Sequence, residues 1–510
     1  MSVSDLDLRV FADYERDFQE ATDVVVVGSG PGGAVVAHEL TARGLRVVLV
    51  EEGPAFTPPD YEVEGGISMA RTLREGGLRA TSGTVLPTMQ AIALGGGSLV
   101  NSAICVRAPA FVLDRWCDEF SLERSSRTDL DPHYDVVGSY LGISPTPEEV
   151  QGRRNLLFRD GCEALGISHE PIARNVRGCR GSGECFTGCR SRAKQSMDIT
   201  YIPDALRRGA TVLTSARVEH VDTEGGRAVG VSGRIVAPFT GQPGFSFRVR
   251  ARAVVLAAGC MATPVLLQRS GDLANRSGQV GRNLRFHPGV AVMGIFEEPV
   301  QPQFGATQGY QSLHFLEAGY KLETLWAPPP VLAVRLPGSG AALKQHMADI
   351  PRAAIWDAIG SCNRSVGTVK PRRRGLDPHL RWQLHRDDIP ILKHALFSLA
   401  EIFFAAGARK VLSGVHGIPD ELHSLEEARV LETRDIRGTD LIMGGNHAFC
   451  TTRMHGDPNR GVVDELGQCH DVENLWVADT GVFPRCPSVN PMWTLMALAH
   501  RSAHALADRL

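Results

Sequence analysis

The sequence predicts an α/β protein in which a discontinuous dinucleotide-binding domain contains an inserted second domain. Two observations lead to this prediction. A strand, a glycine loop, a helix and a second strand follow one another from about residue 22, and similar strand and helix patterns return after residue 444. Between about residues 301 and 434 the glycine triplets disappear and clustered prolines interrupt the pattern, which indicates a separate layer.

The glycine loop defines the first domain. Gly28, Gly30 and Gly33 fill the three glycine positions of Gly-x-Gly-x-x-Gly, and Glu51 follows at about the 20-residue spacing of a ribose-binding carboxylate. In a dinucleotide site such glycines allow a tight turn, close approach of the backbone to a pyrophosphate, and close packing of helix on strand. The alternative is a glycine-rich turn in an ordinary α/β unit. The predicted elements are a strand at 24–27, a helix at 34–43 and a strand at 45–50.

Composition limits the classes of protein to which the chain can belong. Apolar residues make up 43 % of the chain, charged residues 22 %, and the net charge is −3, so we expect a globular protein without a nucleic-acid partner. No run of about 18 apolar residues predicts a membrane span. The acidic amino terminus lacks the apolar core of a signal peptide, so we expect a cytoplasmic location. The 11 cysteines, an odd number, favour reduced thiols over a disulfide framework.

Further motifs follow in a fixed order. They are a glycine loop at 95–101 (GGGSLVN), a signature at 259–271, an NLxxHP-type segment at 281–288, a histidine segment at 446–454 and a block at 464–499. On these motifs the chain resembles the glucose–methanol–choline (GMC) oxidoreductases, FAD enzymes that mostly oxidise alcohols. The resemblance implies a Rossmann-like FAD-binding domain at 22–300 and 444–510, with cap and loop segments near 65–93 and 110–200. It also implies an α+β substrate-binding domain, built on an antiparallel sheet, at 301–434.

The resemblance assigns residues to FAD. Gly28, Gly30, Gly33 and Glu51 would hold the adenosine half, and Val218 would meet the adenine through its backbone. Asn101 would lie beside the isoalloxazine. Asp479 would approach the pyrophosphate or the ribityl chain, with a plain turn carboxylate as the alternative. The other implied cofactor-binding residues are Gly96, Ser98 and Pro491.

The catalytic pair implied by the resemblance is His447 and Asn490. Removal of a hydride from an alcohol requires a base within hydrogen-bond reach of the hydroxyl, and histidine titrates near neutral pH. Asparagine offers an amide donor to the same oxygen. The remaining motif histidines lack this support and are interpreted as structural or solvent-facing: His287, which would fix a turn before Pro288, His455 and His500.

Cysteines 179, 185 and 189 form a C-x5-C-x3-C loop. Structural zinc usually requires four ligands with tighter spacing, so we expect a structural loop rather than a metal site, with a redox disulfide as the alternative. The loop resembles one in the GMC branch that includes long-chain alcohol oxidases. Lys194 and Ser196 could lie close to the cofactor, and Cys450 is expected to be a buried inert thiol.

Three functions remain open at this point. The first is oxidation of an alcohol, with hydride transfer to the flavin and oxygen or a redox carrier as electron acceptor. The substrate of this reaction would be a fatty alcohol, a sterol or another bulky alcohol. The second is a lyase of the hydroxynitrile lyase type, which binds FAD without redox turnover. The third is a non-catalytic flavoprotein, which the retained His447 and Asn490 argue against.

Overall fold

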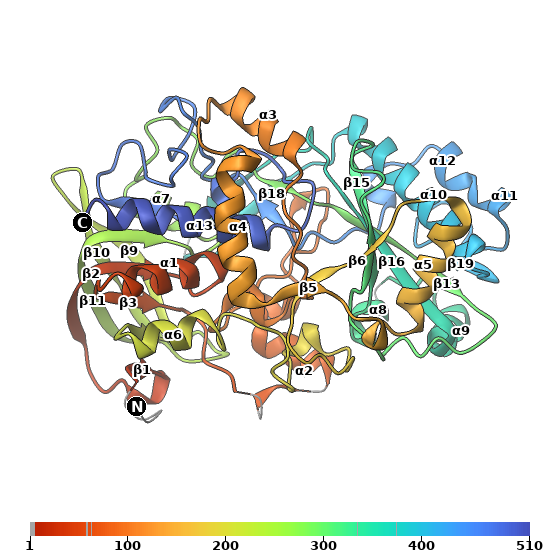
Figure 1. The fold of residues 1–510 in the computed structure, drawn as a ribbon, viewed down its shortest axis with the longest axis horizontal. Helices are drawn as coiled ribbons and strands as arrows, with labels where there is room; N and C mark the ends of the chain where they lie inside the picture. Colours follow the sequence, from red (N-terminus) through yellow and green to blue (C-terminus); the bar gives the residue numbers. More distant parts are fainter. Residues whose placement is uncertain (1–5, 58–59, 63, 334, 374) are drawn as a thin grey trace.

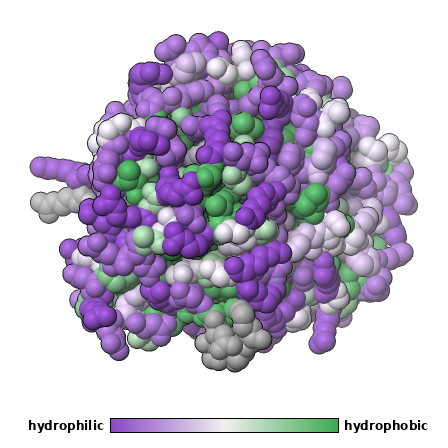
Figure 2. All heavy atoms as spheres, turned by 60° about the vertical axis from the view of Figure 1, so that its left-hand side comes forward, coloured by the Kyte–Doolittle hydropathy of each residue, from purple (hydrophilic) through white to green (hydrophobic). Residues whose placement is uncertain are grey.

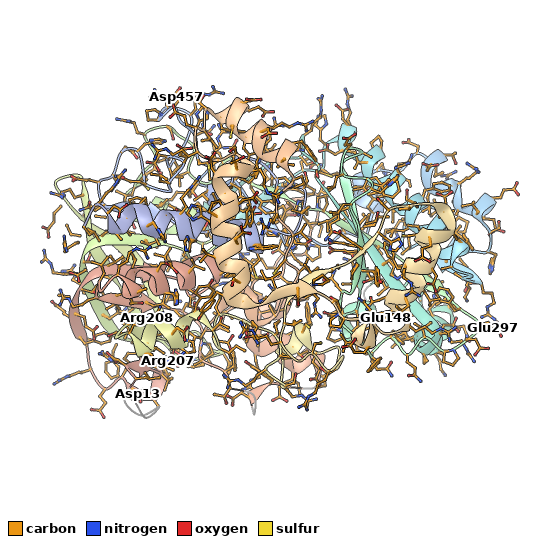
Figure 3. All side chains as sticks on the ribbon, viewed as in Figure 1. Asp13, Glu148, Arg207, Arg208, Glu297 and Asp457 are labelled. Atoms are coloured by element: carbon orange, nitrogen blue, oxygen red, sulfur yellow. The ribbon has the colours of Figure 1, made fainter. Side chains whose placement is uncertain are left out.

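The computed structural model describes residues 6–57, 60–62, 64–333, 335–373 and 375–510. Two large sheets, each with its own layer of helices, lie at opposite ends of an elongated molecule (Figure 1). The α/β class and the division into a cofactor side and an antiparallel substrate side are both confirmed. Charged side chains such as Glu297 and Asp457 project outward from the ribbon (Figure 3).

The first sheet has a parallel centre formed by near-continuous apolar runs. Its strand order is β1-β8-β3-β2-β11-β10-β9, and β22 also pairs with β11. A parallel strand is covered on both faces, which explains why β2 ends in four valines that are almost fully buried. The strands are β1 (Leu8–Arg9), β2 (Phe18–Val27), β3 (Val47–Val50), β8 (Thr211–Leu213), β9 (Ala216–Glu224), β10 (Arg227–Val236), β11 (Pro243–Leu256) and β22 (Leu475–Val477).

Helix α1 (Pro31–Ala42) and the closing helix α13 (Met492–Ala507) lie side by side next to this sheet (Figure 1). Helix α1 also packs closely on the loop that follows β2. This packing requires glycine at position 33, because a Cβ at Gly33 would lie 2.0 Å from the carbonyl oxygen of Gly28. On its other side α13 packs against α4 (Arg127–Leu141), where Tyr134 donates a 2.8 Å hydrogen bond to Thr494. Helix α6 (Tyr201–Arg207) packs beside α1, and α7 (Thr263–Arg269) packs against β9.

The second sheet is antiparallel, and its central strands are buried along most of their length. Its strand order is β20-β19-β13-β16-β15-β14-β6. One face packs on α5 (Arg153–Leu165) and α10 (Ile389–Ala405), where Trp356 stacks on Phe403 with ring centroids 3.6 Å apart. The strands are β6 (Glu170–Pro171), β13 (Gly289–Ile295), β14 (Tyr310–Ser312), β15 (Tyr320–Leu325), β16 (Ala353–Gly360), β19 (Lys410–Leu412) and β20 (Glu421–Leu422).

The antiparallel sheet begins earlier in the chain than the predicted boundary at residue 301. Strand β13 is a central member, paired with β16 and β19, although it lies in the segment assigned to the FAD-binding domain. The edge strand β6 comes from the predicted cap and loop segment. Pro288 and Gly289 form a turn signal at the start of β13, and the predicted boundary at residue 301 lies one strand later than this signal. We therefore place the start of the second domain near residue 289.

Among the described residues, no helix combines the length and the hydrophobicity that crossing a membrane requires.

Candidate active site

The first glycine loop leaves space for a phosphate group. Gly28 has φ +100°, and a Cβ there would meet the carbonyl oxygen of Ala257 at 2.3 Å, so both conformation and packing require glycine. Gly30 is the N-cap of α1, and a Cβ at this position would meet no protein atom within 4 Å. The open side of Gly30 therefore faces the space at a helix amino terminus, where a pyrophosphate is stabilised by free N–H groups.

Glu51 lies at the carboxyl end of β3, next to this loop. Its Oε2 accepts hydrogen bonds from Ser29 Oγ at 2.6 Å and Ser29 N at 3.0 Å, and its Oε1 accepts from Gly53 N at 2.8 Å. Burial raises the pKa of Glu51, while these donors oppose the shift. A carboxylate has about four acceptor positions, so the three protein donors leave one for a ribose hydroxyl.

Glu51→Gln is expected to weaken FAD binding by roughly 1–3 kcal/mol, because a charge-assisted hydrogen bond to ribose becomes a neutral one. Titration of apoprotein with FAD measures the effect. The unfolding temperature of the apoprotein serves as a control, since Gln also disturbs the bonds to Ser29 and Gly53. An unchanged dissociation constant with a lower unfolding temperature would limit Glu51 to a scaffolding role.

The second glycine loop lies against the first. Gly95 N donates to Ser29 Oγ at 2.9 Å, and a Cβ at Gly96 would approach the Cα of Gly30 to 2.7 Å. Ser98 stabilises the loop from within, since its Oγ donates to Gly95 O at 2.6 Å. These bonds bring Gly96 and Ser98 close to Gly30, and their contact with FAD stays a prediction.

Asn101 ends this loop beside the start of α13. Its Nδ2 donates to Met492 Sδ at 3.1 Å, and Met492 follows Asn490 and Pro491 directly in the chain. Lys194 Nζ donates to the carbonyl oxygens of Leu99 and Asn101, at 2.6 and 2.9 Å. Lys194 thus holds the end of the predicted flavin loop, and its closeness to the cofactor stays a prediction.

The cysteine loop packs behind Lys194. Lys194 Nζ donates to Cys185 O at 2.8 Å, and Arg174 Nη2 donates to Cys185 Sγ at 3.0 Å. All 11 cysteines are free thiols. The contacts tie the loop to residues 99–101, which supports a structural role, and this assignment stays a prediction. Cys450 is buried, and burial raises the pKa of its thiol to about 11.

Val218 lies in a strand that contacts Glu51, and Asp479 follows strand β22. Val218 lies in β9, two residues after Ala216, whose N–H donates to Glu51 O at 2.9 Å. Asp479 is buried and caps a short turn, accepting from Gly481 N at 2.8 Å, and it also accepts from Gly259 N at 3.0 Å and Thr263 Oγ1 at 2.5 Å. Burial raises the pKa of Asp479 to about 6. These contacts join two motifs of the chain, 259–271 and 464–499, and a direct contact of Asp479 with FAD stays a prediction.

His447 is held by a two-stranded ladder. Strand β12 (Arg285–Phe286) pairs with β21 (Ala448–Phe449), so the next residues, His287 and His447, lie opposite one another. His287 N donates to His447 O at 3.2 Å, and the two Nδ1 atoms are 3.1 Å apart. One imidazole donates in this pair and the other accepts, which leaves Nε2 of His447 for another partner. His287, interpreted from sequence as a turn residue, therefore positions His447.

Asn490 is oriented by a buried ion pair on β15. Lys321 Nζ donates at 2.6 Å both to Asn490 Oδ1 and to Glu323 Oε2, and the two charged side chains are 0 % and 4 % exposed. Since Oδ1 of Asn490 is used in this way, its amide NH₂ remains free to donate. Glu323 is also close enough to His447 to influence its pKa. The Lys321–Glu323 pair thus connects the two predicted catalytic side chains.

Burial keeps the imidazole of His447 neutral. It lowers the pKa of His447 to about 4, with a smaller lowering by Lys321 and an opposing effect of Glu323. Burial also lowers the pKa of His287 well below its usual range. At pH 7 both rings are therefore uncharged, and His447 can act as a proton acceptor.

Comparison with known proteins identifies the family. GMC oxidoreductase models match residues 69–289 and 363–499, and an FAD-binding-domain model matches residues 23–93. The chain is 35 % identical to an uncharacterised GMC-type oxidoreductase of Mycobacterium tuberculosis, over 97 % of this chain and 77 % of the relative. A long-chain-alcohol oxidase of Arabidopsis thaliana is 28 % identical, over 97 % of this chain and 69 % of the relative.

A solved structure supports the fold. Pyridoxine 4-oxidase from Mesorbium loti has a TM-score of 0.71 at 19 % identity, over 95 % of this chain and 99 % of the other. The open space at Gly30, the buried carboxylate of Glu51 and the second glycine loop fit a dinucleotide cofactor. The chain therefore belongs to the GMC oxidoreductase family and binds FAD.

Proposed function

We propose that the protein oxidises an alcohol to an aldehyde or ketone, with His447 and Asn490 as the groups that contact the substrate oxygen. The observation that carries this proposal is the pairing of a neutral, fixed imidazole with an oriented amide, linked through Lys321 and Glu323. Burial of the Lys321–Glu323 pair costs desolvation energy, which favours a functional role for the pair over a stabilising one. The Arabidopsis thaliana relative is a long-chain-alcohol oxidase, which agrees with the proposal.

In this mechanism the chain's residues bind, orient and deprotonate the alcohol. The Asn490 NH₂ group donates to the substrate oxygen while Lys321 keeps the amide from turning. Nε2 of His447 accepts the hydroxyl proton, in the tautomer in which His447 Nδ1–H donates to His287. Bound FAD supplies the acceptor for the hydride from the carbinol carbon, and oxygen or a redox carrier then takes the electrons.

The pH profile tests the state of His447. Since its pKa lies near 4, the flavin reduction rate at saturating alcohol is expected to stay constant between pH 8 and pH 5 and to fall only as pH drops towards 4. A base with the ordinary histidine pKa of about 6.5 would lose roughly 30-fold in rate by pH 5. Such a 30-fold loss, with the fold intact by circular dichroism, would contradict the assigned environment.

The substrate wall changes character along strand β15. Lys321 and Glu323 point to the same side as Leu325, because alternate residues of a strand share a face. On the neighbouring strand Asp357 lies opposite Glu323, and Ile355 lies opposite Leu325. The polar end lies beside Asn490, and the apolar end, Leu325 and Ile355, packs in an apolar cluster with Met293 and Trp326. We favour an amphiphilic alcohol, such as a fatty alcohol, whose hydroxyl meets the polar end, in line with the long-chain-alcohol oxidase relative.

An anaerobic screen of alcohols tests the proposed function. Straight-chain alkanols of increasing length, a sterol and an amino alcohol are mixed with holoenzyme under argon, and the flavin absorbance is recorded. Bleaching by alkanols, faster as the chain lengthens, is the expected result. If no alcohol bleaches the flavin while a hydroxynitrile is cleaved, the lyase function replaces alcohol oxidation.

A further inference from the structure

A cluster of imidazole and carboxylate groups lies away from the active site, where α1 and α13 run together. We call Glu39, His500 and His504 the histidine–carboxylate cluster. Glu39 is in α1, and the two histidines are one turn apart on α13, so both project from the same helix face. Nε2 or Nδ1 of each ring and one carboxylate oxygen all lie within 4.8 Å of one another. The molecule is predominantly hydrophilic on the side where α13 ends (Figure 2).

The distances in the cluster match a metal site better than hydrogen bonds. Oε2 of Glu39 is 3.7 Å from Nε2 of His500 and 3.4 Å from Nε2 of His504. Hydrogen bonds between such atoms are usually 2.7–3.2 Å long. A tetrahedral zinc ion about 2.0–2.1 Å from each ligand holds its ligand atoms about 3.3 Å apart. Two imidazoles therefore approach one carboxylate oxygen at nearly the separation that a shared ion would set.

A third histidine orients His500. Nδ1 of His500 lies 2.8 Å from Nδ1 of His133 in α4. When His500 donates this hydrogen bond, its Nε2 carries a lone pair on the side of Glu39. Histidine ligands of metals almost always donate their other ring N–H to a neighbouring acceptor in this way.

Arg43 occupies the position that a cation would take. Its Nη1 forms an ion pair with Glu39 at 3.0 Å, and its Nη2 donates to Nε2 of His504 at 2.6 Å. The donation shows that Nε2 of His504 is unprotonated in this arrangement, because arginine has no acceptor. The side chain of Arg43 is 32 % exposed and can move into solvent. It is therefore a removable competitor for the same ligand atoms.

We propose that Glu39, His500 and His504 bind one divalent transition-metal ion, Zn²⁺ in the first instance, with water as the fourth ligand. Two imidazoles and a carboxylate are ligands that zinc accepts. The ion would connect α1 and α13 near their carboxyl ends. The amino ends of the same helices begin at Gly30 and just after Asn490, so the site would brace the two helices that carry the cofactor loop and the catalytic amide.

The test is calorimetric titration of ZnCl₂ into holoenzyme that has been dialysed against EDTA. We expect one equivalent of Zn²⁺ to bind and to raise the thermal unfolding midpoint. His504→Gln should weaken binding at least about 100-fold, and His133→Gln, which removes the outer partner, about 10–100-fold. Since His504 is 39 % exposed, its replacement leaves the fold intact, which circular dichroism checks.

Two further variants make the test specific. Arg43→Gln should tighten Zn²⁺ binding, because it frees Nε2 of His504 and removes a positive charge. His220→Gln replaces an exposed histidine on β9, outside the cluster, and should leave binding unchanged. Absence of saturable Zn²⁺ binding to the wild type would overturn the proposal, and so would binding that His500→Gln and His504→Gln both leave unaltered.

Discussion

Gly30→Val is expected to give a folded protein that no longer retains FAD. The backbone at Gly30 has φ −64°, which valine adopts, and a Cβ there meets no protein atom within 4 Å. The added side chain instead fills the space in which the pyrophosphate approaches the backbone. Loss of two charge-assisted hydrogen bonds of about 1.5 kcal/mol each would weaken FAD binding on the order of 100-fold. Flavin content and apoprotein titration measure the effect.

Gly33→Val is the matched control for this prediction. Its Cβ would lie 2.0 Å from the carbonyl oxygen of Gly28, so the helix cannot stay in place against the strand. This variant should lose both the fold and the flavin, whereas Gly30→Val loses only the flavin. A Gly30→Val protein with full flavin occupancy would show that the pyrophosphate does not lie at this loop.

His447→Ala is expected to slow anaerobic flavin reduction by about 10²–10⁴-fold while FAD stays bound, because it removes the proton acceptor. Asn490→Ala should cost about 10–100-fold, which corresponds to one buried donor of roughly 1–3 kcal/mol. The double variant should be impaired less than additively, since both side chains hold one substrate oxygen. Stopped-flow absorbance of the flavin under argon gives the rates.

His416→Ala serves as a control, because it removes an exposed histidine that lies in the second domain. It should reduce its flavin at the wild-type rate. A His447→Ala enzyme with that same rate would remove His447 from the mechanism. Because His447 is only part of a cluster with His287 and Lys321, unfolding midpoints must accompany the rates.

The sequence could predict the cofactor side because its signals are local. The β2–α1–β3 unit combines a valine run, three glycines and a carboxylate within one short segment, and each has its own physical reason. The contacts of Glu51 with Ser29 and Gly53 are equally local. The start of the second domain is less clear in the sequence, because the loss of glycine triplets at residue 301 comes one strand after the Pro288-Gly289 turn signal at the start of β13.

The residues that contact His447 and Asn490 are distant from them in the sequence, and only the folded chain brings them together. His287 meets His447 only because β12 and β21 pair, and two-residue strands leave no periodic pattern in a sequence. Lys321 and Glu323 alternate with apolar residues in β15, a pattern that is typical of a strand with one solvent-facing side. Their side of the strand is instead buried against Asn490. The one available signal was the His-Pro motif at His287, which was interpreted as a turn.

The histidine–carboxylate cluster could not be predicted from the sequence either. The spacing of His500 and His504 is visible in the sequence, but such a pair is common on helices. Its partners, Glu39 and His133, come from two other helices that only the packed fold brings together.

The most direct test of the central claim is the stoichiometry of a single anaerobic turnover. Holoenzyme is mixed under argon with the alkanol that bleaches the flavin fastest, and the aldehyde formed is measured beside the loss of flavin absorbance. Alcohol oxidation through His447 and Asn490 predicts one aldehyde per reduced flavin in the wild type, with both signals slowed together in His447→Ala. Consumption of substrate while the flavin stays oxidised would contradict it.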